Sequence, residues 1–154
     1  MEDINREFES IEAVFQNDDI GATLEVLKKK ADDGDAKSQF LVGHGTFMKF
    51  YMDNYGGNVR GIADEVNGEV ISWMTKSANQ GYTLAQLSLS EIYRDEDRCE
   101  EVDKVKGLMW AIIGTLNSSE NNPINSYMEE NGISDEEVKK AEVLAREWQS
   151  SNLK

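Results

Sequence analysis

Cysteine, proline and histidine are almost absent from this chain of 154 residues. Cys99, Pro123 and His44 are each the only residue of their kind. A single cysteine cannot form a disulfide within the chain, which is typical of proteins from a reducing compartment. The first residues show no basic segment followed by an apolar one. The longest apolar run, residues 108–113, is far shorter than the roughly 20 residues that cross a bilayer. We therefore expect a cytoplasmic protein that is not inserted in a membrane.

Positive charge is scarce as well. The chain has 16 Lys+Arg against 30 Asp+Glu, a formal net charge of −14. Nucleic-acid-binding proteins neutralise phosphates with clustered basic residues, and an anionic membrane repels an acidic chain. The side chains of the one basic run, Lys28 to Lys30, would point to different faces of a helix, which is typical of solvated surface. We therefore expect that the partner is neither a nucleic acid nor a membrane. We expect a basic protein, because an acidic surface accelerates its association.

What the chain does contain is helical periodicity. Hydrophobic residues make up 39 % of the sequence, enough for a core. They recur at the three- and four-residue spacing of amphipathic helices, and the near absence of proline leaves such helices uninterrupted. The periodic stretches are residues 4–15, 20–31, 70–78, 105–116 and 138–148. No stretch alternates long enough to indicate a strand, so the predicted fold class is all-α.

Part of the chain repeats itself. Residues 31–39 align with residues 78–86, so that Gly34 corresponds to Gly81 at an offset of 47. Trp73 and Trp110 lie 37 residues apart, which places an insertion at about residues 48–68 of the first copy. A repeat of this length built from helix pairs is typical of an α-solenoid. The two glycines are expected to end helices, because glycine readily adopts the left-handed conformation found there.

Two segments have the spacing of a capping box, in which a Ser or Thr and a Glu or Gln three residues later bond each other's backbone N–H groups. They are Thr83 with Gln86, and Ser134 with Glu137. Each pair predicts the first turn of a helix.

These repeats resemble the Sel1-like repeat family, a relative of the tetratricopeptide repeats. The resemblance is carried by residues 34–43 followed by 71–81, and by residues 85–93 followed by 103–111, with Gly, Ala, Gln and Trp at the family's spacing. It implies a short right-handed α/α solenoid of helix pairs, closed by a C-terminal capping helix, that binds proteins. The implied layout of this single domain is an N-terminal helical pair (1–33), a first repeat (34–81), a second repeat (82–117) and C-terminal capping helices (124–150).

Residues that could support catalysis are few. His44 could be an acid–base group or a ligand, but a helix residue beside an aromatic cluster is the favoured interpretation. One histidine and one cysteine are too few for a zinc site. Acidic neighbours disfavour the reactive thiolate of Cys99. We therefore expect no catalytic residue, no cofactor and no metal.

Two groups of residues are candidates for partner binding. The acidic group could be a solvated loop between helices or an electrostatic contact for a basic partner, and the aromatic group could be core or apolar anchors. The acidic candidates are Glu91, Asp95, Glu96, Asp97, Glu100 and Glu101, and the aromatic candidates are Phe47, Tyr51 and Tyr55.

A small acidic domain without a recognisable active site favours a non-catalytic protein-binding module. The leading hypothesis is a bacterial cytosolic inhibitor, or immunity protein, that neutralises a basic toxin or nuclease-like partner through its acidic surface. The alternative is a general Sel1-like adaptor or scaffold in regulation or signalling, whose binding depends more on apolar contacts than on charge. Hydrolytic activity has been linked with cysteine-rich secreted relatives, and a chain with one cysteine departs from that branch.

Overall fold

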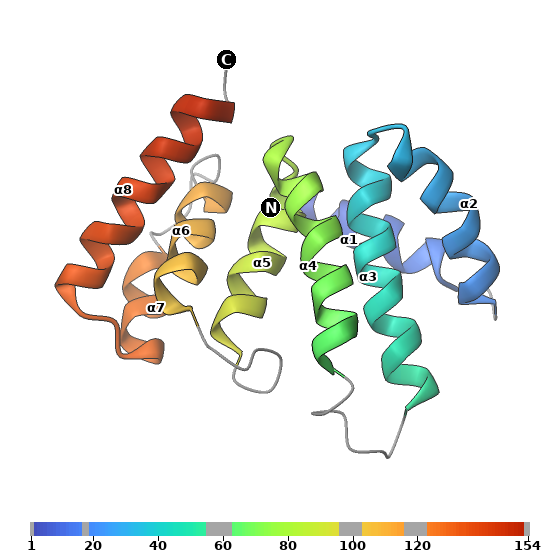
Figure 1. Cartoon of the computed structure of the whole chain (residues 1–154), viewed down its shortest axis with the longest axis horizontal. Helices are drawn as coiled ribbons and strands as arrows, with labels where there is room; N and C mark the ends of the chain where they lie inside the picture. Colours follow the sequence, from blue (N-terminus) through green and yellow to red (C-terminus); the bar gives the residue numbers. More distant parts are fainter. Residues whose placement is uncertain (1, 17–18, 55–62, 96–102, 116–122, 153–154) are drawn as a thin grey trace.

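The computed structural model consists of helices joined by turns and loops (Figure 1). It describes all residues except 1, 17–18, 55–62, 96–102, 116–122 and 153–154. The described residues form helices and no strand, which confirms the predicted all-α class. The helices are α1 (Glu2–Val14), α2 (Ile20–Asp32), α3 (Ala36–Asp53), α4 (Ala63–Asn79), α5 (Thr83–Arg94), α6 (Lys104–Thr115), α7 (Pro123–Asn131) and α8 (Asp135–Asn152).

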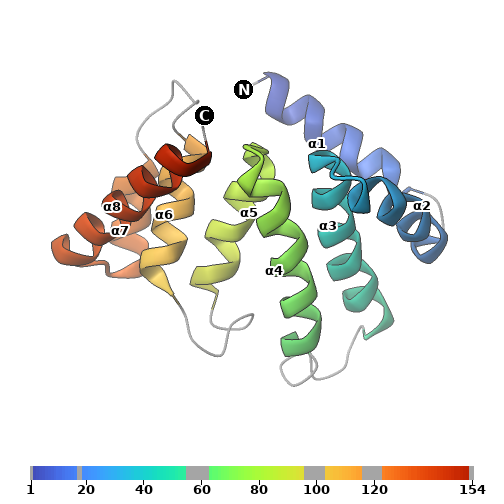
Figure 2. The same ribbon diagram turned by 45° about the horizontal axis from the view of Figure 1, so that its top comes forward.

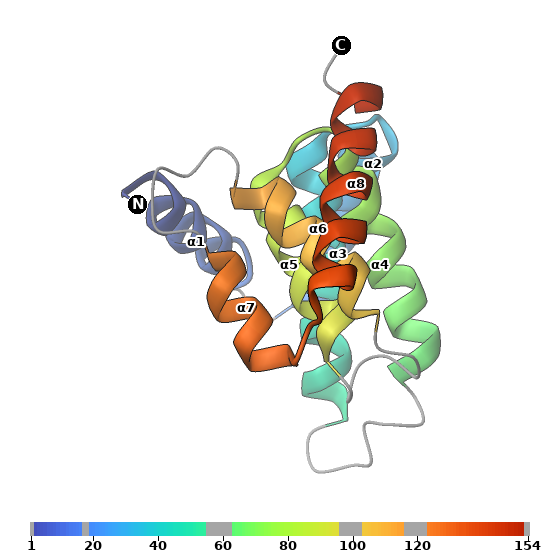
Figure 3. The same ribbon diagram turned by 90° about the vertical axis from the view of Figure 1, so that its left-hand side faces the viewer.

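The helices from α2 to α6 each pack against the next one along the chain, and α7 and α8 both pack against α6. Figure 1 shows α3, α5 and α7 running in one direction, and α4, α6 and α8 in the other. Figure 2 shows α8, α6, α5, α4 and α3 in a row, with α1 crossing one end of α3. Seen along this row in Figure 3, α1 and α7 lie on one side, and α4 and α8 lie on the other. One cluster of buried apolar side chains extends through this row from α1 to α8.

The turns before α3 and α5 have the same geometry. Gly34 and Gly81 have φ of 95° and 85°, the left-handed conformation expected of helix-ending glycines. The N–H of Asp35 donates to the carbonyl of Lys30 at 3.1 Å, and that of Tyr82 to Ser77 at 3.3 Å. Each residue of the second turn lies 47 positions after its counterpart, so the aligned sequences form the same turn.

A buried glutamine secures each of these turns. The Gln39 side-chain amide donates to the carbonyl of Ala31 at 3.0 Å, and that of Gln86 to Ala78 at 3.1 Å. Each bond adds a second donor to a carbonyl at the end of the preceding helix, which also accepts the N–H of Gly34 or Gly81 in the turn. The repeated glutamine therefore links each helix to the end of the one before it in both copies.

The predicted capping boxes have different outcomes. At α8 the Ser134 N–H donates to Glu137 at 2.8 Å, and the Glu137 N–H donates to Ser134 Oγ at 3.4 Å, which confirms that box. This bonding lowers the pKa of Glu137. The box at Thr83 and Gln86 is wrong, because α5 begins after Tyr82, which makes no side-chain cap bond. The amide of Gln86 instead turns back to the preceding helix.

The insertion predicted at residues 48–68 lengthens two helices. Residues 48–53 continue α3, and residues 63–68 begin α4. As a result α3 and α4 have 18 and 17 residues, whereas α5 and α6 have 12 each. We call α3–α4 the long hairpin and α5–α6 the short hairpin. Among the helices that the structure describes, none is long and apolar enough to cross a membrane.

Candidate functional site

The structure describes four of the nine predicted binding residues. Phe47 and Tyr51 lie in the C-terminal half of α3, and Glu91 and Asp95 lie at the end of α5. Because α3 and α5 run in the same direction, the C-terminal ends of both helices lie along the same edge of the row (Figure 1). The other five lie outside the described residues: Tyr55, Glu96, Asp97, Glu100 and Glu101.

The predicted aromatic residues belong to a continuous aromatic face of α3, formed by Phe40, His44, Phe47 and Tyr51. The Phe40 and His44 rings stack with centroids 5.8 Å apart, and Phe47 and Tyr51 stack at 6.5 Å. Phe15, which directly follows α1, packs against His44 at 5.9 Å, so this histidine lies within an aromatic cluster, as the favoured interpretation has it. Exposure rises from 2 % at Phe40 to 50 % at Tyr51. The face therefore begins in the core and ends at the surface, and its role as an apolar anchor stays a prediction.

The described acidic residues form small surface contacts. Glu91 is exposed and pairs with Arg94 at 3.2 Å, and Arg94 also reaches Glu130 of α7 at 3.5 Å. Asp95 is half-buried and ends α5, with its N–H donating to the carbonyl of Ile92. Exposed ion pairs of this kind stabilise a fold by only about 0–1 kcal/mol. Glu91 can therefore change partners at little energetic cost.

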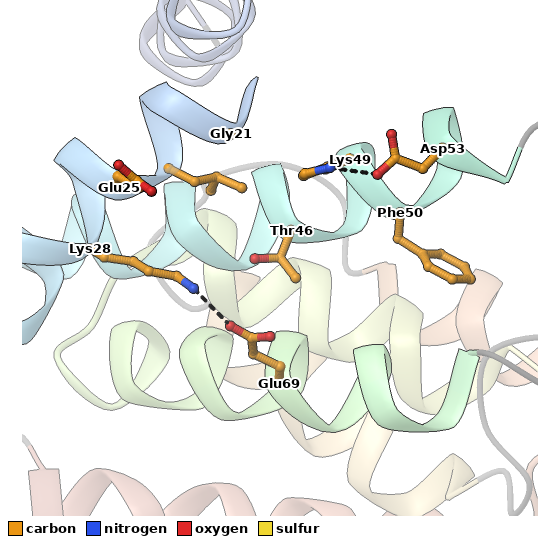
Figure 4. Close-up of a pocket in the computed structure, with 9 residues that line it drawn as sticks. Gly21, Glu25, Lys28, Thr46, Lys49, Phe50, Asp53 and Glu69 are labelled. Atoms are coloured by element: carbon orange, nitrogen blue, oxygen red, sulfur yellow. Dashed lines mark hydrogen bonds and ion pairs between the residues drawn. The ribbon is translucent and has the colours of Figure 1, made fainter. Parts of the chain in front are cut away.

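A cleft of about 440 Å³ lies between α2, α3 and α4 (Figure 4). No pattern in the sequence predicted this cleft. Its apolar floor contains the buried side chains of Leu24 and Phe50. Charged side chains of both signs surround that floor, so we call it the charged cleft. The remaining lining residues are Gly21, Glu25, Lys28, Thr46, Lys49, Asp53 and Glu69.

Two ion pairs close the rim of the charged cleft. Lys28 of α2 reaches Glu69 of α4 at 3.4 Å, and Lys49 pairs with Asp53 one turn along α3 at 2.5 Å (Figure 4). The third carboxylate, Glu25, makes no ion pair within the described part of the chain. An apolar floor beneath carboxylates suits the aliphatic stem and charged head of a lysine or arginine side chain.

The charged cleft and the aromatic face lie on opposite sides of α3. Residues 46, 49, 50 and 53 line the cleft, whereas residues 40, 44, 47 and 51 form the face. At 100° per residue, these two sets point in roughly opposite directions. The extra length of α3 therefore contributes to two separate surfaces. The sequence pattern of α3 contains both sets, but nothing in it indicates that α2 and α4 close one of them into a cleft.

No cluster of three or more residues suited to a metal occurs within the ranges that the structure describes. Comparisons of the chain with protein-family models, characterised proteins and solved structures find no match.

Proposed function

We propose that the chain is a Sel1-like α-solenoid that acts as a non-catalytic protein-binding module in the cytoplasm. The repeated turn, with its glycine and its buried glutamine, supports this architecture, because it joins successive helix pairs in the same way. The order of the helices along the row supports it further. A fold by itself does not define an activity, so the binding role rests on the surface described next.

The observation that carries the proposal is that exposed apolar and acidic groups lie along the same edge of the row, where α3 and α5 both end. Tyr51 and Met52 are 50 % and 62 % exposed at the end of α3, and the acidic end of α5 lies along the same edge. Aromatic anchors beside charged groups are typical of protein interfaces, in which a few apolar residues contribute most of the affinity. The net charge of −14 selects a basic partner. We propose that the chain inhibits such a partner, as an immunity protein neutralises a basic toxin or nuclease.

The experiment begins with capture of partners from the native cytosol by the tagged chain, followed by washes at low and high salt. The expected result is one basic, salt-sensitive protein at equal stoichiometry whose activity the chain blocks. Reversal of the charges at Asp95, Glu96 and Asp97 should then slow association and weaken binding. The control carries three reversals at exposed acids elsewhere and has the same net charge; these acids are Asp32, Glu129 and Glu142. Equal loss in both variants would remove this acidic segment from the interface.

The apolar anchor is tested separately. Tyr51→Ala should weaken binding about tenfold or more, since a central aromatic residue contributes about 2 kcal/mol or more to an interface. Val26→Ala is the matched control, because Val26 is 63 % exposed on α2. Isothermal titration calorimetry with the captured partner measures both variants. Unchanged affinity of the Tyr51 variant would contradict the proposed site.

A second candidate function, a general adaptor, is favoured by the exposure of Tyr51 and Met52 on the lengthened α3. An adaptor would capture several clients that resist high salt, because apolar contacts are screened little by ions. Reversal of the acids would then have less effect than Tyr51→Ala. The ratio of these two losses distinguishes the adaptor from the inhibitor.

A further inference from the structure

The last helix, α8, has a second apolar surface that none of the described helices covers. Ala141 and Ala145 are buried on the side that packs against α6, whereas Val143 and Leu144 are 46 % and 39 % exposed. These two residues line a groove of about 530 Å³, and Val105 of α6 completes its apolar part. Figure 1 shows α8 at the end of the row, and the exposure of Val143 and Leu144 leaves the groove accessible to another molecule.

The charges around this α8 groove differ from those of the chain as a whole. Glu136 and Glu147 are balanced by Lys139 and Lys140, so the lining carries two charges of each sign. The chain has nearly twice as many acidic as basic residues. A basic partner therefore gains little at the groove, and another copy of this acidic chain meets less repulsion there than elsewhere. At physiological ionic strength, charges more than about 8 Å away are largely screened.

The order of these residues along α8 is self-complementary. When two α8 helices pack antiparallel about a two-fold axis between Val143 and Leu144, Val143 faces Leu144 of the second copy. The same axis places Lys140 of each copy opposite Glu147 of the other, which gives two identical pairs. A two-fold interface of this kind needs one patch that complements itself.

We propose that the chain forms a symmetric dimer through the α8 groove. Val143 and Leu144 make its apolar centre, and the two Lys140–Glu147 pairs fix the antiparallel register. The Lys140–Glu136 ion pair within α8, at 2.9 Å, has both side chains exposed and can rearrange at little cost. The proposal is independent of the acidic binding surface, since the two surfaces lie on different helices.

The test is sedimentation analysis of the full chain over a range of concentrations. The expected result is a monomer–dimer equilibrium. Lys140→Glu and Glu147→Lys should each raise the dimer dissociation constant about tenfold or more, because each change places two like-charged pairs at the interface. The double variant should return it to within about threefold of the original value, since its pairs are again of opposite sign.

Two control variants have the same changes of charge outside the groove. Lys29→Glu on α2 matches Lys140→Glu, and Glu142→Lys on α8 matches Glu147→Lys, and both should leave dimerisation unchanged. Circular dichroism of every variant confirms that α8 remains folded. A chain that is monomeric at all concentrations overturns the proposal. The proposal is also overturned if neither single change raises the dimer dissociation constant, or if the double variant does not return that constant to its original value.

Discussion

The long and short hairpins begin on the same turn but extend to different lengths. Gly34 with Gln39 and Gly81 with Gln86 form matching turns at their starts. From there α3 continues for 18 residues and α5 for 12, a difference of about 9 Å at 1.5 Å per residue. The extra length carries Tyr51 and Met52 on exposed positions and Phe50 and Asp53 in the charged cleft. The shared turn thus builds the fold, and the added length supplies the surfaces available for binding.

The hairpins also differ in how closely their second helices are packed. Gly107 of α6 lies against α7, and a Cβ atom there would clash with the Tyr127 hydroxyl and lie 3.1 Å from the Ser90 carbonyl. Gly68 of α4 has no atom within 4 Å of the same position. Tyr127 is buried by this packing, and its burial raises the pKa of its hydroxyl. At these two positions α6 is therefore packed more closely than α4.

The largest predicted effect follows from this difference. Gly107→Ala should lower the free energy of unfolding by about 2–3 kcal/mol, because α7 must shift to admit the methyl group. Gly68→Ala in the long hairpin should raise it by about 0.5–1 kcal/mol, because alanine is the better helix former. Urea denaturation of the two variants measures the contrast. Equal effects would mean that α7 does not pack closely on α6.

The next effect tests whether the two turns are energetically alike. Gln86→Leu should cost about 1 kcal/mol, because the buried carbonyl of Ala78 loses one of its two donors and keeps only the N–H of Gly81 at 3.0 Å. Gln39→Leu should cost at least as much, since Gln39 also accepts a bond from Gln80 at 2.8 Å. Thermal unfolding of both variants checks the order. A small loss for both would show that these amides do not hold the turns.

A smaller effect concerns the cap that only one copy has. The Asp35 side chain accepts a bond from the Ser38 N–H at 2.7 Å, and hydrogen bonds with the side chain and then the backbone of Ser38 hold the pKa of Asp35 below its ordinary value of 3.8. Asp35→Ala should cost about 1 kcal/mol at neutral pH. Because the folded-state pKa is lowered, this contribution is present above pH 3.8 and is lost as the pH falls through the folded-state value.

Asp35→Asn separates the cap from the charge. Asparagine keeps an acceptor for Ser38 but does not titrate, so its stability should depend less on acid than that of the native chain. Urea unfolding at pH 3 and pH 7 measures the difference. A native chain whose stability loss in acid equals that of the asparagine variant would show that folding does not lower the pKa of Asp35.

Much of the fold could be predicted from sequence, because helices depend on local spacing. The glycines that end α2 and α4 and the Ser134–Glu137 cap follow from patterns within a few residues. The Thr83–Gln86 cap has an equally good spacing but does not form, because Gln86 bonds the carbonyl of Ala78 in the preceding helix. Local spacing could not weigh that tertiary bond against the local one.

The candidate site was less predictable. Spacing placed Phe47 and Tyr51 on one face of a helix, and the structure has them there. The charged cleft depends on how α2 and α4 pack around the far side of the same helix, so Leu24 and Glu69 gave no signal along the chain. The α8 groove likewise depends on which face of α8 the preceding helix covers.

The smallest effect concerns the ion pair that crosses the charged cleft in the long hairpin. Lys28 and Glu69 are 3.4 Å apart and each side chain is 46 % exposed, so water and salt screen their attraction. A double-mutant cycle with Lys28→Met and Glu69→Gln should give a coupling of about 0.5 kcal/mol or less, falling further at high salt. A coupling above about 1 kcal/mol would mean that α2 and α4 are held across the cleft by charge. The ion pair would then stabilise the packing of α2 on α4, and the cleft would not be free to accept a basic side chain of a partner.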